Sequence, residues 1–144
     1  MTGVRTCGSS GVGWEFVHTL VDDCSRLAYS EIHDDERAET VTPFTRRALD
    51  WFLARGIVTE RLLSDNAWAY VKSKGLAQLP GERGIEHWRT KPYSHRPMGR
   101  WSAFFQQTMD REWAHGLSYR SSADRRAALP HWLDHYNESR RHSA

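Results

Sequence analysis

The clearest pattern of hydrophobic and polar positions is a short apolar run that stops at an acidic residue. In the segment RLLSDNAWAY, residues 61–70, two leucines are followed directly by Ser64, Asp65 and Asn66. Such a run predicts a buried strand, here over 57–64, that delivers Asp65 to its carboxyl end. Ligands bind at that edge of an open α/β sheet, which makes Asp65 a candidate functional residue. An Asp at a strand end also serves as a turn former or a helix cap, and the run alone leaves both interpretations open.

Two β-forming segments precede this strand and are joined by a polar turn. Residues 14–22 and 27–32 are rich in aromatic and aliphatic side chains, and the segment between them reads DCSR. The pattern predicts a β-hairpin. We expect Asp22 and Asp23 to accept backbone N–H bonds in its turn rather than to act in catalysis.

The stretch ahead of the hairpin has a different composition. Residues 1–13 hold mostly Gly, Ser and Thr, with little that is apolar. This composition predicts a loose leader followed by one domain at 14–144.

Helical periodicity follows the hairpin. Over 39–55, apolar side chains recur three or four positions apart, which predicts an amphipathic helix packed on the sheet. Thr42-Pro43 is typical of a helix start, and Gly56 of a helix end. The apolar positions are Val41, Phe44, Ala48, Trp51 and Phe52.

The second half of the chain predicts shorter elements. A helix over 68–79, weakened by the polar segment at 72–75 and ended by Pro80, is followed by a strand at 84–88. Two prolines keep the loop at 90–99 from being helical throughout. Three further helices are expected: one over 101–115, one capped by Ser121 or Ser122 and ending near Ala128, and one that begins at Pro130.

Composition places the chain among single-domain globular proteins. Its 144 residues suffice for one core, and seven Trp, five Tyr and five Phe supply bulky apolar side chains. No apolar run approaches the ~18 residues that a membrane span needs. Two cysteines are too few for a disulfide framework or a metal cluster, which predicts a reducing, cytoplasmic environment. His131 and His135 are four apart, as metal-binding pairs are, but without a matching third ligand we expect both to face solvent.

Four phrases in the chain are specific when they are taken together. They are VDDCSR in the hairpin, SDN at the strand end, TKPY in the loop after 89, and the tail REWAHGLSYRSSADRRAALPHWLDHYN at 111–137. In this order, over 14–144, they resemble the integrase catalytic core of insertion-sequence transposases. These are DDE recombinases, and the resemblance is greatest to the IS481/IS3-like branch. It implies an α/β fold of the RNase H-like kind, a mixed sheet flanked by helices. Here the sheet is expected to lack its first core strand, because the match begins in the loop after that strand.

The resemblance also implies a chemistry. Enzymes of this family cleave a phosphodiester and join a 3′-hydroxyl to target DNA, using two Mg²⁺ (or Mn²⁺) ions held by three carboxylates. Asp65 matches the second carboxylate and is the expected metal ligand. The first has no counterpart, and the third falls at Ser102 or Ala103, neither of which ligates Mg²⁺ usefully. Alignments from the two flanks of this position differ by one residue, which we attribute to a small compensated frameshift. Glu112 belongs to a different phrase and is a poor substitute.

The sequence therefore predicts a transposase or integrase core fragment, related to DNA integration and transposition, that is inactive alone. The expected partners are DNA and a homo-oligomer or a mixed oligomer with a full-length transposase. The alternative is a non-catalytic DNA-binding or assembly module that interferes with a full-length transposase. An active nuclease with a rebuilt metal site lacks the necessary acids. Contacts with DNA are expected from Asn66, Arg89, Lys91, Tyr93, Arg96 and Arg100. A missing strand would leave backbone groups unpaired, which predicts marginal stability.

Overall fold

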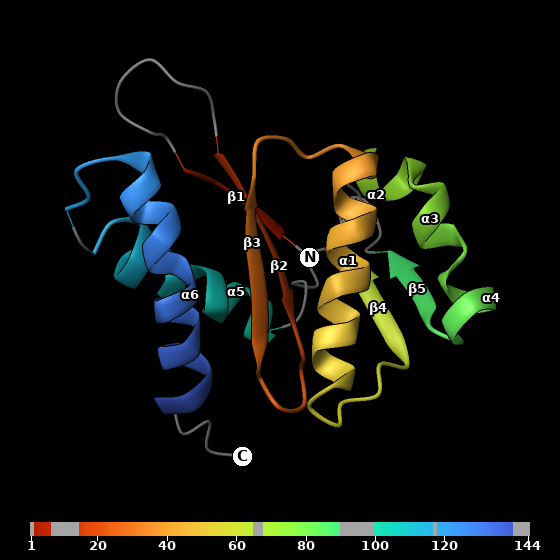
Figure 1. Ribbon diagram of the computed structural model, residues 1–144. Helices are drawn as coiled ribbons and strands as arrows, with labels where there is room; N and C mark the ends of the chain where they lie inside the picture. The colour runs from red at the N-terminus through yellow and green to blue at the C-terminus, as the bar shows by residue number, and fades with distance from the viewer. Residues whose placement is uncertain (1, 7–14, 65–67, 90–99, 117, 140–144) are drawn as a thin grey trace.

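The computed structural model describes residues 2–6, 15–64, 68–89, 100–116 and 118–139, and Figure 1 shows their arrangement. In chain order, the elements are β1 (Thr2–Thr6), β2 (Glu15–Val21), β3 (Ala28–His33), α1 (Ala38–Leu53), β4 (Arg61–Ser64), α2 (Trp68–Lys72), α3 (Lys74–Ala77), α4 (Leu79–Arg83), β5 (Glu86–Arg89), α5 (Arg100–Met109), a π-helical turn (Asp110–Ala114) and α6 (Ser122–Ser139). The predicted α/β class, with helices flanking the strands, is confirmed, although the described strands form two small sheets in place of one mixed sheet.

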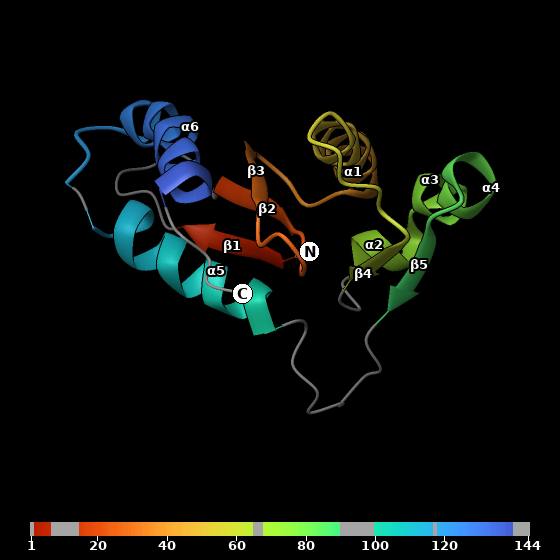
Figure 2. The ribbon, with the colours of Figure 1, turned by 90° about the horizontal axis from the view of Figure 1, so that it is seen from below.

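The described strands form two sheets. β1, β2 and β3 are antiparallel in that order, with Val17 of β2 opposite both Val4 and Ile32. β4 and β5 are parallel, with Leu62 opposite His87. Both faces of the three-stranded sheet are covered, because α1 contacts β2 and β3 while α5 contacts β2 and α6 contacts β3. Figures 1 and 2 show α5 and α6 on one side of this sheet, and α1 with β4 and β5 on the other.

Strand β1 corrects two expectations, a loose leader at 1–13 and a sheet without a strand ahead of the hairpin. Its five residues pair with β2 from Thr2 opposite Thr19 to Thr6 opposite Glu15. Two causes favour this pairing. Three of the five residues are β-branched, and the outer edge of β2 would otherwise present unpaired N–H and C=O groups. The sequence of β1, TGVRT, contains no carboxylate.

The hairpin turn behaves as predicted. The backbone N–H of Ser25 donates to the Asp22 carboxylate at 2.7 Å, and the Asp22 carbonyl accepts from the Arg26 N–H at 2.8 Å. Arg26 has a positive φ of 64°, the left-handed conformation that closes the turn. Asp22 is therefore a turn residue.

Helix α1 begins before the Thr42-Pro43 start that the sequence suggests. It starts at Ala38, four residues before Thr42, so that Pro43 lies inside the helix. The start is fixed by Asp35, whose carboxylate accepts from the Arg37 N–H at 3.0 Å and from the Thr40 hydroxyl at 2.5 Å. These two bonds order the chain directly ahead of the first turn, and they outweigh the N-terminal signal of Pro43.

The other end of α1 was predicted correctly. Gly56 adopts φ of 78°, its N–H bonds the Leu53 carbonyl, and the Ile57 N–H bonds the Phe52 carbonyl, both at 3.0 Å. This pair of bonds is the common way to close a helix with a left-handed Gly.

Three short helices, α2 to α4, occupy residues 68–83, where a single helix over 68–79 was expected. Ser73 is extended, and its hydroxyl accepts the Leu76 N–H at 3.1 Å and pairs with the Thr42 hydroxyl at 2.7 Å. Pro80 lies in the first turn of α4 instead of ending a helix, which is where its missing N–H costs least. Gly75 lies against α1, since a Cβ there would come within 2.3 Å of the Thr42 methyl group.

The C-terminal part also departs from prediction in one place. α6 is one continuous helix across Pro130, where two helices were expected. Leu129, Leu133 and Tyr136 are buried on its inner side, and this packing offsets the backbone hydrogen bond that Pro130 cannot make. The expected cap is confirmed, because the Ser121 hydroxyl accepts the Asp124 N–H at 3.2 Å.

The buried side chains form two clusters on opposite faces of the three-stranded sheet. Under α1, the cluster includes Leu20, Phe44, Phe52, Leu62 and Leu76. Under α5 and α6, it includes Val17, Phe105, Trp113, Leu133 and Tyr136. Strand β2 contributes alternate residues to both clusters, as a strand covered on both faces does. No described helix combines the length and the apolar character needed to cross a membrane.

Candidate nucleic-acid interface

The carboxyl edge of β4 and β5 is the candidate site. The two strands are parallel, and Ser64, the last residue of β4, lies opposite Arg89, the last residue of β5. The ends of β4 and β5, which directly precede Asp65 and the loop at 90–99 in the sequence, therefore lie at the same edge of this sheet. Asp65 and Asn66 themselves lie outside the described residues, and the roles predicted for them stay predictions.

A hydrogen bond ties the two strands together just before this edge. The buried Ser64 hydroxyl and His87 Nε2 are 2.8 Å apart. Burial lowers the pKa of His87, and the nearby Arg89 guanidinium lowers it further. His87 therefore favours its neutral form, and it couples the end of β4 to β5.

The predicted DNA-binding residues are only partly described. Arg89 is exposed at the end of β5. Arg100 opens α5 by its backbone, but its side chain lies outside the described part. Lys91, Tyr93 and Arg96 lie outside it as well. The structure therefore brings Arg89 to the β4–β5 edge and leaves the other five residues as predictions.

Ion pairs neutralise several arginines away from this edge. On α1, Arg46 pairs with Glu82 at 2.6 Å and Arg47 with Glu31 at 2.7 Å. Arg83 pairs with Asp50 at 2.7 Å, and Arg125 and Arg126 both pair with Glu15 at 2.6 Å. Glu15, Glu31, Asp50 and Glu82 are therefore each paired with an arginine.

Three exposed cations in the segments that border the edge have no ion pair with any described acid. They are Lys72 and Lys74, at the junction of α2 and α3, and Arg89. Because α2 begins four residues after Ser64, its first Cα lies within about 14 Å of that residue. The sequence did not single out Lys72 or Lys74. Their position just after the acid-bearing strand end was the available signal.

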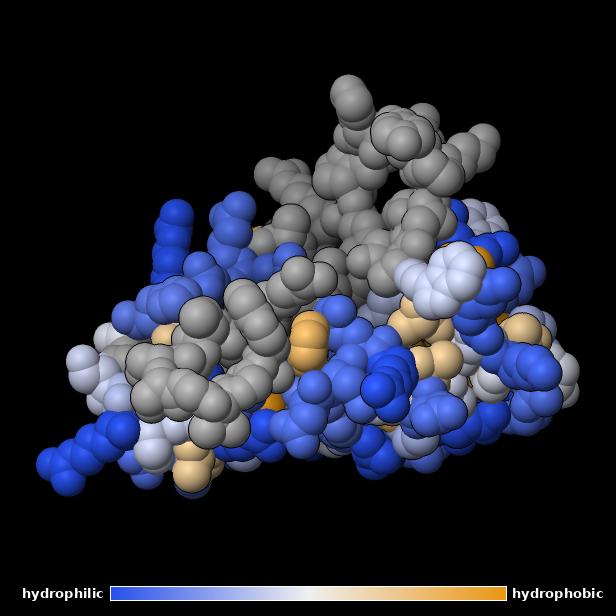
Figure 3. Space-filling model, turned by 90° about the horizontal axis from the view of Figure 1, so that it is seen from above, coloured by the Kyte–Doolittle hydropathy of each residue, from blue (hydrophilic) through white to orange (hydrophobic). Residues whose placement is uncertain are grey.

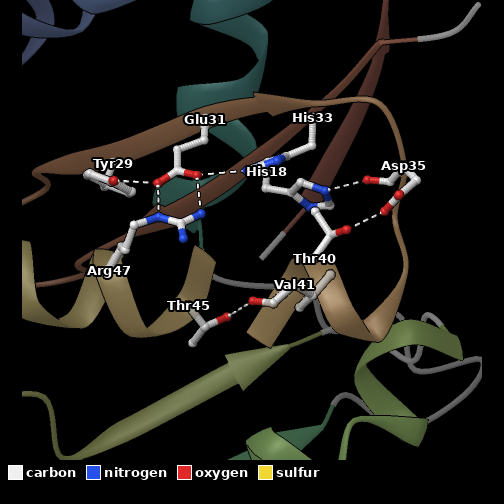
Figure 4. A network of polar contacts seen from close by, with 9 residues as sticks. All are labelled: His18, Tyr29, Glu31, His33, Asp35, Thr40, Val41, Thr45 and Arg47. Atoms are coloured by element: carbon white, nitrogen blue, oxygen red, sulfur yellow. Dashed lines mark hydrogen bonds and ion pairs between the residues drawn. The ribbon is translucent and has the colours of Figure 1, made fainter. Parts of the chain in front are cut away.

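The polar network around Glu31 is structural. Glu31 accepts hydrogen bonds from Tyr29, His33 and both nitrogens of the Arg47 fork, as Figure 4 shows. Burial alone would raise the pKa of Glu31, but hydrogen bonds from Arg47, Tyr29 and His33 outweigh it and lower the pKa to about 2. Burial and the bond to Glu31 raise the pKa of Tyr29 to about 12. Both Glu31 oxygens are occupied, so the network fastens α1 to β3.

A second carboxylate network fastens β2 to α6. Glu15, 6% exposed, accepts from Ser122, Arg125 and Arg126. Burial would raise the pKa of Glu15, but these three hydrogen bonds together lower it to about 2. Arg126 also reaches Asp34 at 2.6 Å.

The described residues do not fit a pair of divalent ions. No group of three or more His, Cys, Asp or Glu side chains converges among them. β1 carries no acid, and α5 carries none along its length. Glu112, in the π-helical turn, accepts the Trp132 indole N–H at 3.2 Å. His131 and His135 are both exposed, as predicted. The donor set that two Mg²⁺ ions require is therefore not found in this part of the chain.

The surface has no broad apolar band on the face drawn in Figure 3, where hydrophilic side chains cover most of the described part. The large exposed apolar side chains include Trp68, with 73% of its surface accessible, and Trp88, with 52%. Both lie on elements that border the β4–β5 edge. The sequence assigned no function to them, because exposure of a Trp cannot be inferred from its position in a helical or strand pattern.

Comparison with known proteins agrees with the fold. The catalytic core domain of BIV integrase superposes with a TM-score of 0.65 at 18% identity, over 96% of this chain and 82% of that one. A chain of the simian T-cell lymphotropic virus intasome, in complex with the PP2A regulatory subunit B56 gamma, gives 0.62 at 16% identity. The match to the intasome covers 99% of this chain and 55% of that one, so this chain spans about half of its length. No curated protein shows significant sequence similarity to this chain.

Family models extend the agreement from fold to sequence. Residues 3–95 match one model of the integrase core domain, and residues 83–144 match a second model with the same description. The first match alone covers more than half of the chain. The chain therefore belongs to the integrase core domain family.

Proposed function

We propose that this chain is a DNA-binding core of the insertion-sequence transposase type, from the IS481/IS3-like branch, that does not transfer DNA strands by itself. The supporting observation is the parallel pairing of Ser64 with Arg89, which brings the residues just before Asp65 and just before the basic loop to one sheet edge. A ligand that meets this edge meets both segments.

Charge favours DNA as that ligand. Lys72, Lys74 and Arg89 are exposed, and no ion pair with a described carboxylate neutralises them. The next cations along the chain are Lys91 and Arg96. Phosphate groups bind such cations through charge and the release of counterions, without any demand on base sequence. The net charge of +2 hides this local excess, because acids elsewhere balance the arginines of α1 and α6.

The lack of strand transfer follows from the carboxylates. Two-metal phosphoryl transfer needs several carboxylates around both ions, and Asp65 is the single candidate at this edge. The flanking elements offer no replacement, since β1 reads TGVRT and α5 reads RWSAFFQQTM. A compensated frameshift near Gly99 accounts for the absence of an acid from α5. Binding without cleavage would let the chain compete with a full-length transposase for DNA.

A titration of fluorescent DNA tests the binding half of this proposal. The purified chain is mixed with a labelled blunt duplex at increasing salt, and the affinity is read from fluorescence anisotropy. The slope of log affinity against log salt is expected to fall by about 0.9 for each phosphate contacted. A slope near zero, or no binding at low salt, would overturn DNA binding.

A cleavage assay tests the catalytic half. The same duplex is incubated with the chain and Mg²⁺ or Mn²⁺, and products are resolved on a denaturing gel. We expect no product above that of the metal alone. Metal-dependent cleavage that disappears in Asp65→Asn would show that an active site exists and would overturn the proposed inactivity.

A further inference from the structure

Two exposed tryptophans on the elements that border the β4–β5 edge differ in how their surroundings are charged. Trp88 of β5 lies under the Arg61 guanidinium, 4.8 Å from the ring centroid, and its indole N–H donates to Glu86 at 3.0 Å. Glu86 also lies 3.8 Å from Arg61, so this cation is balanced by a carboxylate. The set of Arg61, Glu86 and Trp88 is neutral, and its polar groups bind one another.

Trp68 has a different setting. It opens α2, directly after the Asp65 segment, and Lys72 lies over its ring with the ammonium 4.7 Å from the centroid. Among the described residues, no carboxylate pairs with Lys72. Even with this cation over it, the indole keeps 73% of its surface accessible. Most of the apolar surface of this indole therefore faces water, and no described carboxylate balances the adjacent ammonium.

An unpaired DNA base matches both features. A base presents a flat π-face that stacks on an aromatic ring, and the phosphate beside it supplies the negative charge that Lys72 lacks. A paired base inside a duplex has both faces covered by its neighbours, so a surface indole cannot stack on it. The chemistry of the site therefore selects nucleotides at single-stranded ends or at distorted steps.

We propose that Trp68 and Lys72 form a stacking site for an unpaired nucleotide of DNA. This inference rests on the proposed function, because the cations at the edge must first hold the DNA. It goes beyond that function by naming the form of DNA preferred, a duplex that carries a single-stranded extension.

The test compares two fluorescent ligands, a blunt duplex and the same duplex with a short thymidine overhang. The wild-type chain is expected to bind the overhang duplex more tightly. Trp68→Ala should lower affinity for the overhang duplex by about 5- to 100-fold, the usual effect of one lost stacking contact. Its affinity for the blunt duplex should change little, and Trp68→Phe should restore part of the preference.

Trp88→Ala is the matched control, since it removes an exposed indole with a cation over it from a neutral setting. It should leave the preference for the overhang unchanged. Equal preference in the wild-type chain and Trp68→Ala, or equal losses in Trp68→Ala and Trp88→Ala, would overturn the stacking site while DNA binding stands. Failure of the wild-type chain to bind the blunt duplex at low salt would overturn the proposed function as well. Circular dichroism of each variant shows that the fold is kept.

Discussion

The side-chain amide of Asn137 pairs with the backbone of Ala28 at two points. Asn137 Oδ1 accepts the Ala28 N–H and Asn137 Nδ2 donates to the Ala28 carbonyl, both at 2.9 Å. One amide thus satisfies the donor and the acceptor of a residue at the outer edge of β3, much as a neighbouring strand would. Ala28 is 1% exposed, so water cannot take over these bonds.

Removal of this amide should destabilise the fold. Asn137→Ala leaves a buried N–H and C=O of Ala28 unpaired, at a cost of about 1–3 kcal/mol for each group left unsatisfied. Urea unfolding followed by circular dichroism measures the change. Glu138→Ala, at an exposed neighbouring position of α6, is the matched control and should lie within about 0.5 kcal/mol of wild type. Equal changes in the free energy of unfolding for the two substitutions would show that the two Asn137–Ala28 hydrogen bonds do not stabilise the fold.

Acid should unfold the domain through Glu15 and Glu31. Both have a pKa of about 2 in the fold against 4.5 otherwise. A carboxyl with a lowered folded pKa contributes stability that is complete above its unfolded pKa and is lost as pH falls to the folded one. The free energy of unfolding should therefore decrease between pH 4.5 and about 2.

The matched variants Glu15→Gln and Glu31→Gln should each be less stable than wild type at pH 7 and show a shallower decrease in acid. Glu15→Gln should cost more, because it leaves the Arg125 guanidinium, 11% exposed, without its carboxylate. If both variants lost stability in acid just as wild type does, the acid-induced unfolding could not be due to Glu15 and Glu31.

His18 should give a second, separate pH dependence. A carbonyl only accepts, so His18 Nε2 carries the proton that bonds the Asp35 carbonyl at 2.9 Å. His18 Nδ1 is buried and has no described partner. Burial lowers the pKa of His18 below 6.5, and the nearby His33 adds to this, although Asp35 and Glu36 oppose it. Because the unfolded chain then binds the proton more readily, stability should fall as pH drops through 6.5 and level off below the folded pKa.

His18→Phe keeps a ring of similar size beside Phe44 and removes the titrating group. It should abolish the part of the pH dependence that begins near 6.5 and leave the decrease below 4.5 intact. The His18 imidazole can be followed directly by NMR. A titration midpoint at or above 6.5 in the wild-type protein would contradict this prediction.

Charge at the β4–β5 edge should matter more for DNA binding than charge elsewhere. Lys74→Ala removes an exposed cation that has no described ion pair, and the salt slope of duplex binding should become shallower by about one. Arg46→Ala changes the net charge equally but removes a cation already paired with Glu82. It should leave the slope unchanged, and equal changes in the two variants would mean that net charge alone governs binding.

Elements that depend on periodicity were predictable from the sequence. The hairpin, the buried face of α1 with Phe44 and Ala48, and the turn role of Asp22 all follow from local patterns. Features that depend on a distant partner were not. Ser73 interrupts a helix because it meets Thr42 of α1, and α6 crosses Pro130 because its inner side packs on the sheet. Strand β1 forms because it pairs with the outer edge of β2, and no local pattern in residues 1–13 indicates this partner.

The strand end that precedes Asp65 was predictable from the sequence, and the charges and exposed side chains around it were not. The apolar run before Asp65 predicted the strand end, and the structure places Arg89 opposite Ser64. Which cations remain uncompensated depends on pairs such as Arg46 with Glu82, 36 residues apart, that no local pattern reveals. The exposure of Trp68 likewise depends on what packs around α2.

The contacts that hold α6 to the hairpin set the order in which the chain can complete its fold. Asn137 and Ala28 are 109 residues apart, and Arg126 and Glu15 are 111 apart. During synthesis the hairpin emerges long before α6, and until then the outer edge of β3 and the apolar side chains of β2 lack their cover. Contacts between residues this far apart in the sequence form late and slowly during folding. The emerging chain thus passes through a stage prone to pair with other chains, and a chaperone that shields β3 would raise the yield of folded protein.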